Sequence, residues 1–348
     1  MPDLAAISHA VDLAAFANWL AARALAALAA HDKALHAALI EVAEALPAGA
    51  PNMAKLDALL KKVREINAEA YADMLRELEA NLRAFISYEA DYRRRLLAAI
   101  AKAEVMEASP ERIKAALRDE PFQGRLLREW AQTLGQATAQ RLRDTVAIGF
   151  AEGKTTAEIV RAVRGTRAGK YQDGILQIDR RHAEAVVRTS VQHFANYAAQ
   201  ETYRQNRGVV KALRWVSTLD SRTSEICMLR DGLKFSLAGK GIGHDVAFLG
   251  GPPAHWNCRS TLVPVTAFDD DRGQRAAAGG PVPKKTTYAD WIKAQPASVQ
   301  RSVLGATRAR LMREGKLDLT RFYDNRGRWL TLDELRDSDE ATFKRLGL

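Results

Sequence analysis

Apolar residues in the first part of the chain recur in alternating steps of four and three, which predicts a long helix that packs along a seam. This first run reaches residue 46 and is interrupted by polar Asn18 and Asp32, a device that often fixes register or oligomeric state. The proline-flanked segment 47–51 then breaks the helix. The seam positions are Ile7, Val11, Ala14, Asn18, Ala21, Leu25, Leu28, Asp32, Leu35, Leu39, Val42 and Leu46.

A second run predicts another helix from about Asn52 to Glu107, which would be about 80 Å long if unbroken, at ~1.5 Å per residue. Two helices of this length suit an antiparallel hairpin that packs on itself or a docking arm for another protein. The apolar face of this run consists of Leu56, Leu59, Val63, Ile66, Ala70, Met74, Leu78, Leu82, Phe85, Tyr92, Leu96 and Ile100.

Shorter helices are predicted in the middle of the chain. Ser109-Pro110-Glu111 starts one of them, with serine as the cap and proline in the first turn, and this helix stops near Pro121. Others are expected at about 122–151, from Thr155 or Thr156 to Arg164, and at 175–206, with a loop at 165–174.

The pattern then changes to short strands, at 209–219, 233–236 and 260–265. Residues 269–285 have no apolar period and are typical of a flexible linker, and tail helices are expected at about 288–294, 299–313 and 331–336. We therefore predict a mainly α fold with a small α+β module, in five segments. These are a long helical hairpin or docking arm (1–108), a helical middle (109–207), the small module (208–268), a flexible linker (269–287) and a helical tail (288–348).

The net charge of +10 is unevenly spread along the 348 residues. Residues 1–108 carry 12 Lys/Arg against 15 Asp/Glu, whereas the remaining residues carry 40 against 27. This asymmetry indicates a front part that binds protein or self-associates, and a rear part able to face an anion such as DNA. The longest apolar stretch, at 20–30, looks too short and too alanine-rich for a bilayer, and no secretory signal is evident, so we expect synthesis in a cytoplasm and no membrane contact.

Residues with chemical potential gather between Asp220 and Arg259. His255 and Cys258 have the spacing of metal ligands, and Cys227 could supply a third, so these three are candidate zinc ligands. A structural zinc needs a fourth ligand, which would have to be His244 or an acid, because Ser224 ligates poorly. The ligand count therefore weighs against a metal.

Two other interpretations of this cluster stay open. A metal-dependent nuclease or DNA-processing enzyme could use His244, His255 and Cys258 beside Asn257, but no second metal-ligating His follows and no Cys-x-x-Cys pair frames the site. The favoured interpretation is structural. The turn at 220–223 and the loop at 252–259 would lock irregular backbone through arginine forks and prolines, with both cysteines buried and free, or paired after release into an oxidising medium. Phosphate-loop, dinucleotide and Gly-x-Ser-x-Gly signatures are missing as well, so we predict no catalytic residue, no cofactor and no enzyme.

Three motifs in this order resemble the phage Mu F-like minor head proteins, also called the phage head-morphogenesis family. The first is an Arg-Thr helix followed by Ala-Asn-Tyr-Ala at 195–198, the second a tryptophan with a central turn, and the third a closing loop of the Pro-Pro-x-His-x-Asn-Cys-Arg kind. The resemblance covers roughly residues 110–340 and is firmest over 185–265. The motif residues are Arg188, Thr189, Trp215, Asp220, Arg222, Thr223, Asp231, Gly232, Pro252, Pro253, His255, Asn257, Cys258 and Arg259.

The resemblance implies a minor capsid protein of a tailed phage, made in the host cytoplasm and placed inside the shell near the portal vertex. Its implied partners are the portal protein or the major capsid protein, with packaged DNA reached through the basic residues of 109–348. The nuclease or DNA-processing enzyme described above is the alternative function, and a general DNA-binding assembly factor that leaves the mature particle is a third hypothesis. Many family members carry cysteines where this chain has Ser224 and Ser260, which weakens an inherited metal or disulfide proposal here.

Overall fold

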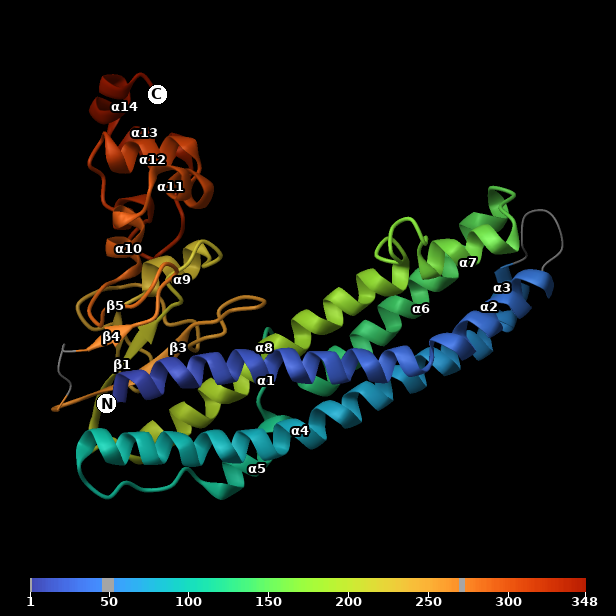
Figure 1. The fold of residues 1–348 in the computed structure, drawn as a ribbon, viewed down its shortest axis with the longest axis horizontal. Helices are drawn as coiled ribbons and strands as arrows, with labels where there is room; N and C mark the ends of the chain where they lie inside the picture. The colour runs from blue at the N-terminus through green and yellow to red at the C-terminus, as the bar shows by residue number, and fades with distance from the viewer. Residues whose placement is uncertain (1, 46–52, 269–272) are drawn as a thin grey trace. The chain divides into compact units, whose positions relative to one another are not determined.

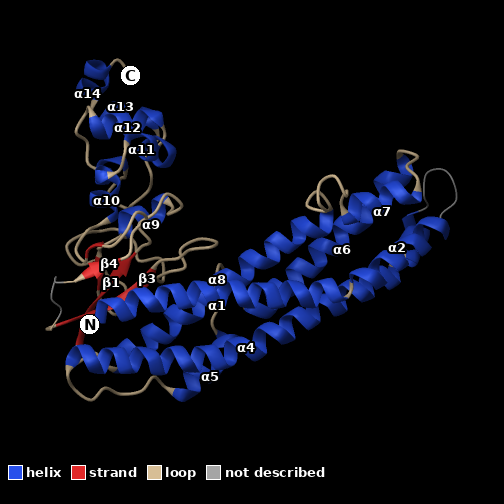
Figure 2. Cartoon of the chain, viewed as in Figure 1, coloured by secondary structure: helices blue, strands red, loops and turns tan. Residues whose placement is uncertain are grey.

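The computed structural model describes residues 2–45, 53–268 and 273–348, and it confirms a mainly α fold with a small antiparallel sheet module (Figures 1 and 2). The helices are α1 (Pro2–Ala30), α2 (Asp32–Ala45), α3 (Met53–Leu59), α4 (Lys61–Ala101), α5 (Pro110–Asp119), α6 (Leu127–Ala151), α7 (Thr156–Arg164), α8 (Ile175–Gln205), α9 (Glu225–Arg230), α10 (Tyr288–Ala294), α11 (Ala297–Leu304), α12 (Ala306–Arg313), α13 (Leu332–Ser338) and α14 (Glu340–Leu346), with a 3₁₀ turn at Leu319–Phe322. The strands are β1 (Val210–Val216), β2 (Lys234–Phe235), β3 (Thr261–Thr266), β4 (Gln274–Arg275) and β5 (Val282–Pro283).

Several helix boundaries differ from the prediction. The second long helix is divided at Leu60 into α3 and α4 and ends at Ala101, and α6 begins at Leu127 because residues 122–125 form a tight bridge of backbone hydrogen bonds. Gly305, with φ +78°, separates α11 from α12 where one helix was expected, and α14 was not predicted. The predicted break at 47–51 lies outside the described residues.

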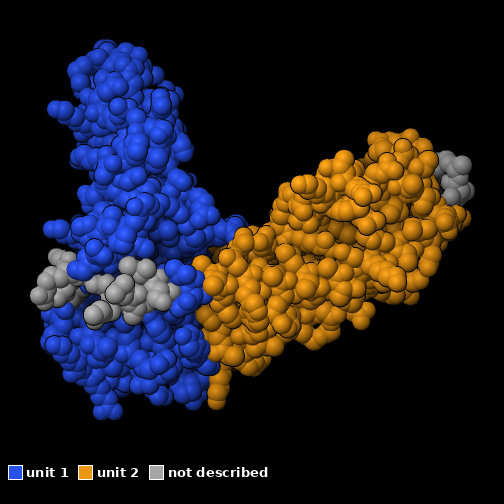
Figure 3. Space-filling view, viewed as in Figure 1, with its two compact units in different colours: residues 1–13, 86–113, 192–348 blue, residues 14–85, 114–191 orange. Residues whose placement is uncertain are grey.

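The chain forms two compact units that alternate along the sequence (Figure 3). The helical unit consists of residues 14–85 and 114–191, and the module unit of residues 1–13, 86–113 and 192–348. The linear division into five segments followed secondary-structure type, whereas α1, α4 and α8 each contribute residues to both compact units.

The helical unit is held together by polar contacts between its long helices as well as by an apolar core. Asn67 on α4 donates a 2.8 Å hydrogen bond to the Gly135 carbonyl on α6, and the Tyr71 and Thr138 hydroxyls lie 2.8 Å apart. A Cβ at Gly135 would lie 3.3 Å from the Tyr71 ring, so glycine permits the close approach of these helices. The core contains Leu35, Leu39, Leu56, Leu60, Val63, Leu142, Val146, Ile159 and Val163.

The predicted first seam is confirmed from Leu28 to Val42 and only partly correct before it, where Ala21 is buried. Its apolar members from Leu28 onward to residue 42 are buried, but Val11 is 63% exposed, and Leu13 and Leu20 are buried instead. In an alanine-rich helix the apolar character is nearly uniform around the axis, so packing rather than pattern decided which face is covered.

The two polar interruptions of that seam both meet arginines of α8. Arg188 donates a 3.1 Å hydrogen bond to Asn18, and Arg180 forms an ion pair with Asp32. Both contacts lie within the helical unit. The interruptions therefore have partners within the same chain, which gives them a role in fixing helix register without a second molecule.

One helical stretch, His9–Ala45, has the length and composition to cross a membrane, with a mean hydropathy of 1.5 and 28% of the tested window buried. The expectation that the apolar stretch is too short is therefore corrected. A single such helix is weak evidence for a membrane, because an apolar helix of a soluble bundle passes the same test. Within this stretch Arg23 pairs with Glu77, and His31 lies 2.7 Å from Asp73, so part of its polar face contacts α4.

The module unit is organised by a three-stranded antiparallel sheet in the order β2-β1-β3. Trp215 and Phe235 are fully buried on it, and Leu262 of β3 pairs with Trp215 of β1. The core of the sheet also includes Leu97, Val105, Ala199, Tyr203, Val210, Leu213, Cys227 and Cys258. A second core in the tail contains Tyr288, Trp291, Ile292, Leu304, Leu311, Phe322 and Phe343.

The predicted linker has regular structure in its described part. Residues 273–285 contain the β4–β5 hairpin, in which Gln274 pairs with Pro283 and Arg275 with Val282. Arg275 also reaches the buried carboxylate of Asp231. No apolar period is present at these residues, because polar contacts help to hold the hairpin, together with the packing of Ala277 and Val282 against the tail core.

Candidate metal centre

The sheet brings the two cysteine-containing segments together. β1 ends at Val216, which pairs with Thr261 at the start of β3, so the residues that follow β1 and those that precede β3 meet at one end of the sheet. After β1 the chain turns into α9, with Ser224 as its N-cap and Cys227 in its first turn. Before β3 runs the loop that carries His255 and Cys258. Antiparallel pairing therefore places these three residues side by side although Cys227 and Cys258 lie 31 positions apart.

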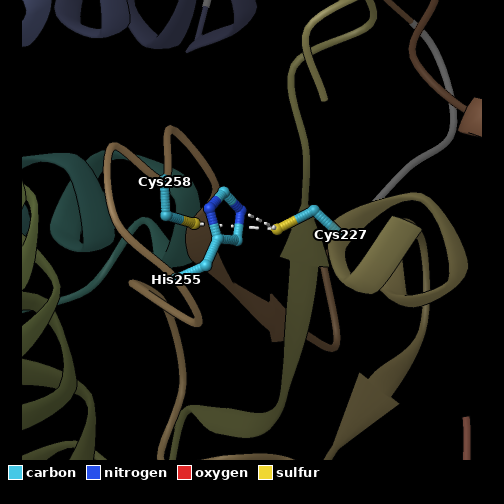
Figure 4. Close-up of side chains that lie close together, drawn as sticks. All are labelled: Cys227, His255 and Cys258. Atoms are coloured by element: carbon cyan, nitrogen blue, oxygen red, sulfur yellow. Dashed lines mark hydrogen bonds between the residues drawn. The ribbon is translucent and has the colours of Figure 1, made fainter. Parts of the chain in front are cut away.

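Cys227, His255 and Cys258 form a compact cluster (Figure 4). Cys227 Sγ lies 3.3 Å from His255 Nε2 and 3.6 Å from Cys258 Sγ, and all three ligand atoms lie within 4.8 Å of one another. Both cysteines are buried, with 2% and 3% exposure, and both are free thiols. His255 Nδ1 lies 2.9 Å from the Trp256 carbonyl, so this nitrogen carries the proton and Nε2 points at the sulfur atoms.

The cluster is electrostatically asymmetric. A hydrogen bond from Cys227, together with interactions from His255, outweighs burial and lowers the pKa of Cys258 to about 4. The same Cys227–Cys258 hydrogen bond raises the pKa of Cys227, and burial adds to this effect. Interaction with the Cys258 thiolate raises the pKa of His255. Cys258 is thus the thiolate of the group and Cys227 the thiol that donates to it.

Around this cluster, an arginine fork stabilises the turn that follows β1, as the structural interpretation expected. Arg259 Nη1 and Nη2 lie 2.6 and 2.8 Å from the two carboxylate oxygens of Asp220. Burial disfavours the charged carboxylate, but hydrogen bonds from Arg259 and the Arg222 amide hold the pKa of Asp220 below its ordinary value. The Thr223 hydroxyl donates to the Thr218 carbonyl and closes the turn.

Other motif residues support the scaffold of the module instead of joining the cluster. Asp231 accepts hydrogen bonds from the backbone amides of Ser217 and Tyr288, each at 2.7 Å, and Gly232 donates a 2.8 Å bond back to the Trp215 carbonyl. The peptide bond between Pro252 and Pro253 is cis, and Asn257 has φ +57°, so the closing loop is a series of tight turns.

The structure keeps some of the expected residues apart. His244 is not among the three grouped ligands. Its ring lies edge-on to Phe235 with centroids 4.9 Å apart, and its Nε2 is 2.9 Å from the Lys234 carbonyl. The nuclease set of His244, His255 and Cys258 is therefore not assembled. Arg188 and Thr189 belong to the helical unit and are not part of the cluster.

Two residues that help to build the site were not predicted as site residues from the sequence. Asn196 on α8 accepts a 3.1 Å hydrogen bond from the Leu262 amide and a 3.2 Å bond from the Thr261 hydroxyl, which fixes the start of β3. Ser224 was dismissed as a poor ligand, yet its Oγ is buried without a hydrogen-bond partner among the described residues and lies close enough to Cys227 to influence the pKa of that thiol. The Ala-Asn-Tyr-Ala motif was the available signal for Asn196.

Comparison with known proteins agrees with the motifs. Residues 140–263 match the family model described as phage Mu protein F like protein, a stretch that contains α8, the sheet and the cluster. Neither the curated proteins nor the solved structures contain a match. This match confirms the resemblance inferred from the motifs, and over residues 140–263 the chain is similar to the phage Mu protein F like proteins.

Proposed function

We propose that this chain is a minor capsid protein of a tailed phage, which acts in head assembly and stays in the particle near the portal. The observation that carries this proposal is the family match over 140–263, which includes all three motifs. The described part of the chain supports a structural role, because it is built mainly from long helices and its central loop is locked by polar contacts. Portal protein and major capsid protein are the proposed partners.

Packaged DNA is a further proposed partner. The division into compact units changes which residues we expect to contact it. The charge asymmetry along the sequence does not carry over to the compact units. The helical unit has 22 Lys/Arg against 18 Asp/Glu, and the module unit has 30 against 24. Both units are therefore moderately basic, and a local cluster of cations is a better guide to DNA contact than the halves of the chain.

One such cluster lies at the end of α7 and in the loop that follows. Arg161, Arg164, Arg167 and Lys170 are all exposed, and we name them the α7 basic cluster. The Arg164 guanidinium lies 4.7 Å from the centroid of the Tyr171 ring, which is itself 40% exposed. Cations beside an exposed aromatic ring are suited to phosphate contact and base stacking.

Mass spectrometry of purified virions tests the main proposal. We expect the intact chain to be retained at a few copies per particle, and to bind purified portal or major capsid protein in a pull-down. A chain that is present in assembly intermediates but missing from mature particles would instead indicate an assembly factor.

Gel mobility shifts of the full-length protein on DNA of unrelated sequences test the DNA contact separately. Replacing the α7 basic cluster with alanines should weaken binding at least about tenfold and reduce its salt dependence, because fewer counterions are released. The matched control replaces four exposed tail cations, Arg301, Arg313, Lys316 and Arg321, and should bind nearly as the wild type does. Equal losses of DNA affinity in both variants would contradict the assignment of the DNA contact to the α7 basic cluster. A wild-type protein that does not bind DNA at low salt would contradict the proposed DNA contact altogether.

A further inference from the structure

We infer that Cys227, His255 and Cys258 form a binding site for one zinc ion, with the Ser224 hydroxyl beside the fourth coordination position. The distances between the ligand atoms are close to those that a bound zinc ion requires. Zinc bonds of ~2.3 Å to sulfur and ~2.0–2.1 Å to nitrogen, at tetrahedral angles, require about 3.8 Å between two sulfurs and about 3.6 Å between sulfur and nitrogen. The observed separations are 3.6 Å for the two sulfurs and 3.3 Å for Cys227 Sγ and His255 Nε2.

The orientation of the imidazole also suits a metal ligand. Protein histidines that bind zinc through one nitrogen usually donate the other N–H to a carbonyl or carboxylate, which fixes the tautomer and the ring plane. His255 has this arrangement, with Nδ1 2.9 Å from the Trp256 carbonyl and Nε2 free to face the sulfurs. The backbone amide of Ser260 interacts with Cys258, the kind of outer contact that stabilises a thiolate bound to a metal.

Ser224 supplies a reason to place the fourth position on the α9 side. Its Oγ is buried and makes no hydrogen bond of ordinary geometry within the described parts of the chain, although it interacts with the Cys227 side chain. It lies at the N-cap of α9, three residues before Cys227. A metal held by the other three side chains would give this oxygen, or a water beside it, a partner.

The two cysteines could instead form a disulfide bond, but both are free in this structure. A disulfide bond is ~2.05 Å long, whereas the two sulfurs lie 3.6 Å apart as free thiols with the imidazole against one of them. A purely apolar role for the thiols leaves the inward-facing Nε2 of His255 and the orphaned hydroxyl of Ser224 without a purpose. Two thiolates, an imidazole and zinc form a neutral group, which suits a buried site.

Such an ion would be structural. Cys227 belongs to α9, and His255 and Cys258 belong to the closing loop, so one ion would add a link between two segments that the sheet and the Arg259–Asp220 pair also hold together. Both sulfurs are nearly inaccessible, which leaves little room for a substrate. This inference adds a metal to the scaffold and does not depend on the proposed place of the protein in the virion.

Elemental analysis of the full-length protein, purified without chelator, is the direct test. We expect close to one zinc per chain, and a lower melting temperature after chelation that is restored by added zinc. His255→Ala and Cys258→Ser should each lose the metal. The matched control, His244→Ala, removes a histidine of the same module that does not join the cluster and should retain zinc.

Two measurements keep the test decisive if a variant fails to fold. Cobalt(II) titration of the wild-type chelated protein should produce the intense thiolate-to-metal absorption of a tetrahedral sulfur site. Ser224→Cys should raise zinc affinity at least about tenfold in competition with a chromophoric chelator, because a thiolate replaces a weak fourth ligand. Wild-type protein that contains no zinc and gives no cobalt spectrum would overturn the inference, as would a Cys227–Cys258 disulfide found by mass spectrometry of freshly purified particles.

Discussion

Arg275 forms a two-pronged ion pair with the fully buried carboxylate of Asp231: Nη1 lies 2.9 Å from Oδ2, and Nη2 lies 3.0 Å from Oδ1. Asp231 belongs to the turn after α9 and Arg275 to the β4–β5 hairpin, and the same carboxylate caps the backbone amides of Ser217 and Tyr288. One acidic side chain thus ties the end of β1, the hairpin and the start of the tail together.

We expect Arg275→Ala to lower the free energy of unfolding by about 3–5 kcal/mol, because it leaves a buried carboxylate without its counter-charge. Arg275→Lys should fall between the wild type and Arg275→Ala, since lysine keeps the charge but cannot form the two parallel hydrogen bonds. Chemical unfolding of the purified proteins measures both changes.

Arg222→Ala is the control for that comparison. Arg222 also pairs with an aspartate of the module, at 3.6 Å from Asp220, but its side chain is 79% exposed. Its removal should change the free energy of unfolding by less than about 0.5 kcal/mol. If Arg275→Ala were as mild as this control, the pair would not hold the hairpin.

Burial raises the pKa of Asp179 on α8, and its interactions with Thr138 and Arg141 offset this only in part. The folded protein therefore keeps the Asp179 proton to a higher pH than the unfolded chain does. Because the folded state binds this proton more tightly, the contribution of Asp179 to the free energy of unfolding decreases as the pH rises. The decrease runs from the ordinary pKa of about 3.9 through the raised pKa of the folded state. Asp179→Asn should remove that fall, which urea unfolding between about pH 4 and 7 can measure.

Asp173 should affect the pH dependence of stability in the opposite direction to Asp179. Its carboxylate accepts hydrogen bonds from the Thr166 side chain and amide, at 2.6 and 2.8 Å, and these lower its pKa. Its contribution to stability is present above its ordinary pKa and is lost as pH falls through the lowered folded value. Asp173→Asn should therefore be most harmful near neutral pH, and the same pH trend in both variants would contradict the assignment.

We expect the protein to leave DNA intact. The histidine set that a nuclease would need is not assembled, because His244 lies against Phe235 and outside the Cys227–His255–Cys258 group. Incubation of the full-length protein with duplex and single-stranded DNA in magnesium, manganese or zinc measures this. Metal-dependent cleavage that His255→Ala abolishes would contradict a structural role.

Elements with local signals could be predicted from the sequence. Serine and threonine caps and proline positions marked α5 and α7, and hydrophobic patterning marked β1, β2 and β3 but not the β4–β5 hairpin. The motifs from Arg188 to Arg259 pointed to the family whose model matches residues 140–263. The spacing of His255 and Cys258 was also enough to name them, with Cys227, as candidate ligands. Each of these signals depends on neighbours in sequence, which is why one chain sufficed.

Contacts between residues far apart in the sequence became evident only in the folded chain. Antiparallel pairing of β1 with β3 placed Cys227 beside Cys258 and left His244, a candidate fourth ligand, outside the group. The buried face of the alanine-rich α1 could not be read from a hydrophobic pattern, because it depends on which helices surround α1. The pairing of Arg275 with Asp231 could not be read from one either, because it is a single long-range polar contact. Packing partners and buried charge pairs are properties of the folded chain, and a hydrophobic pattern carries no record of them.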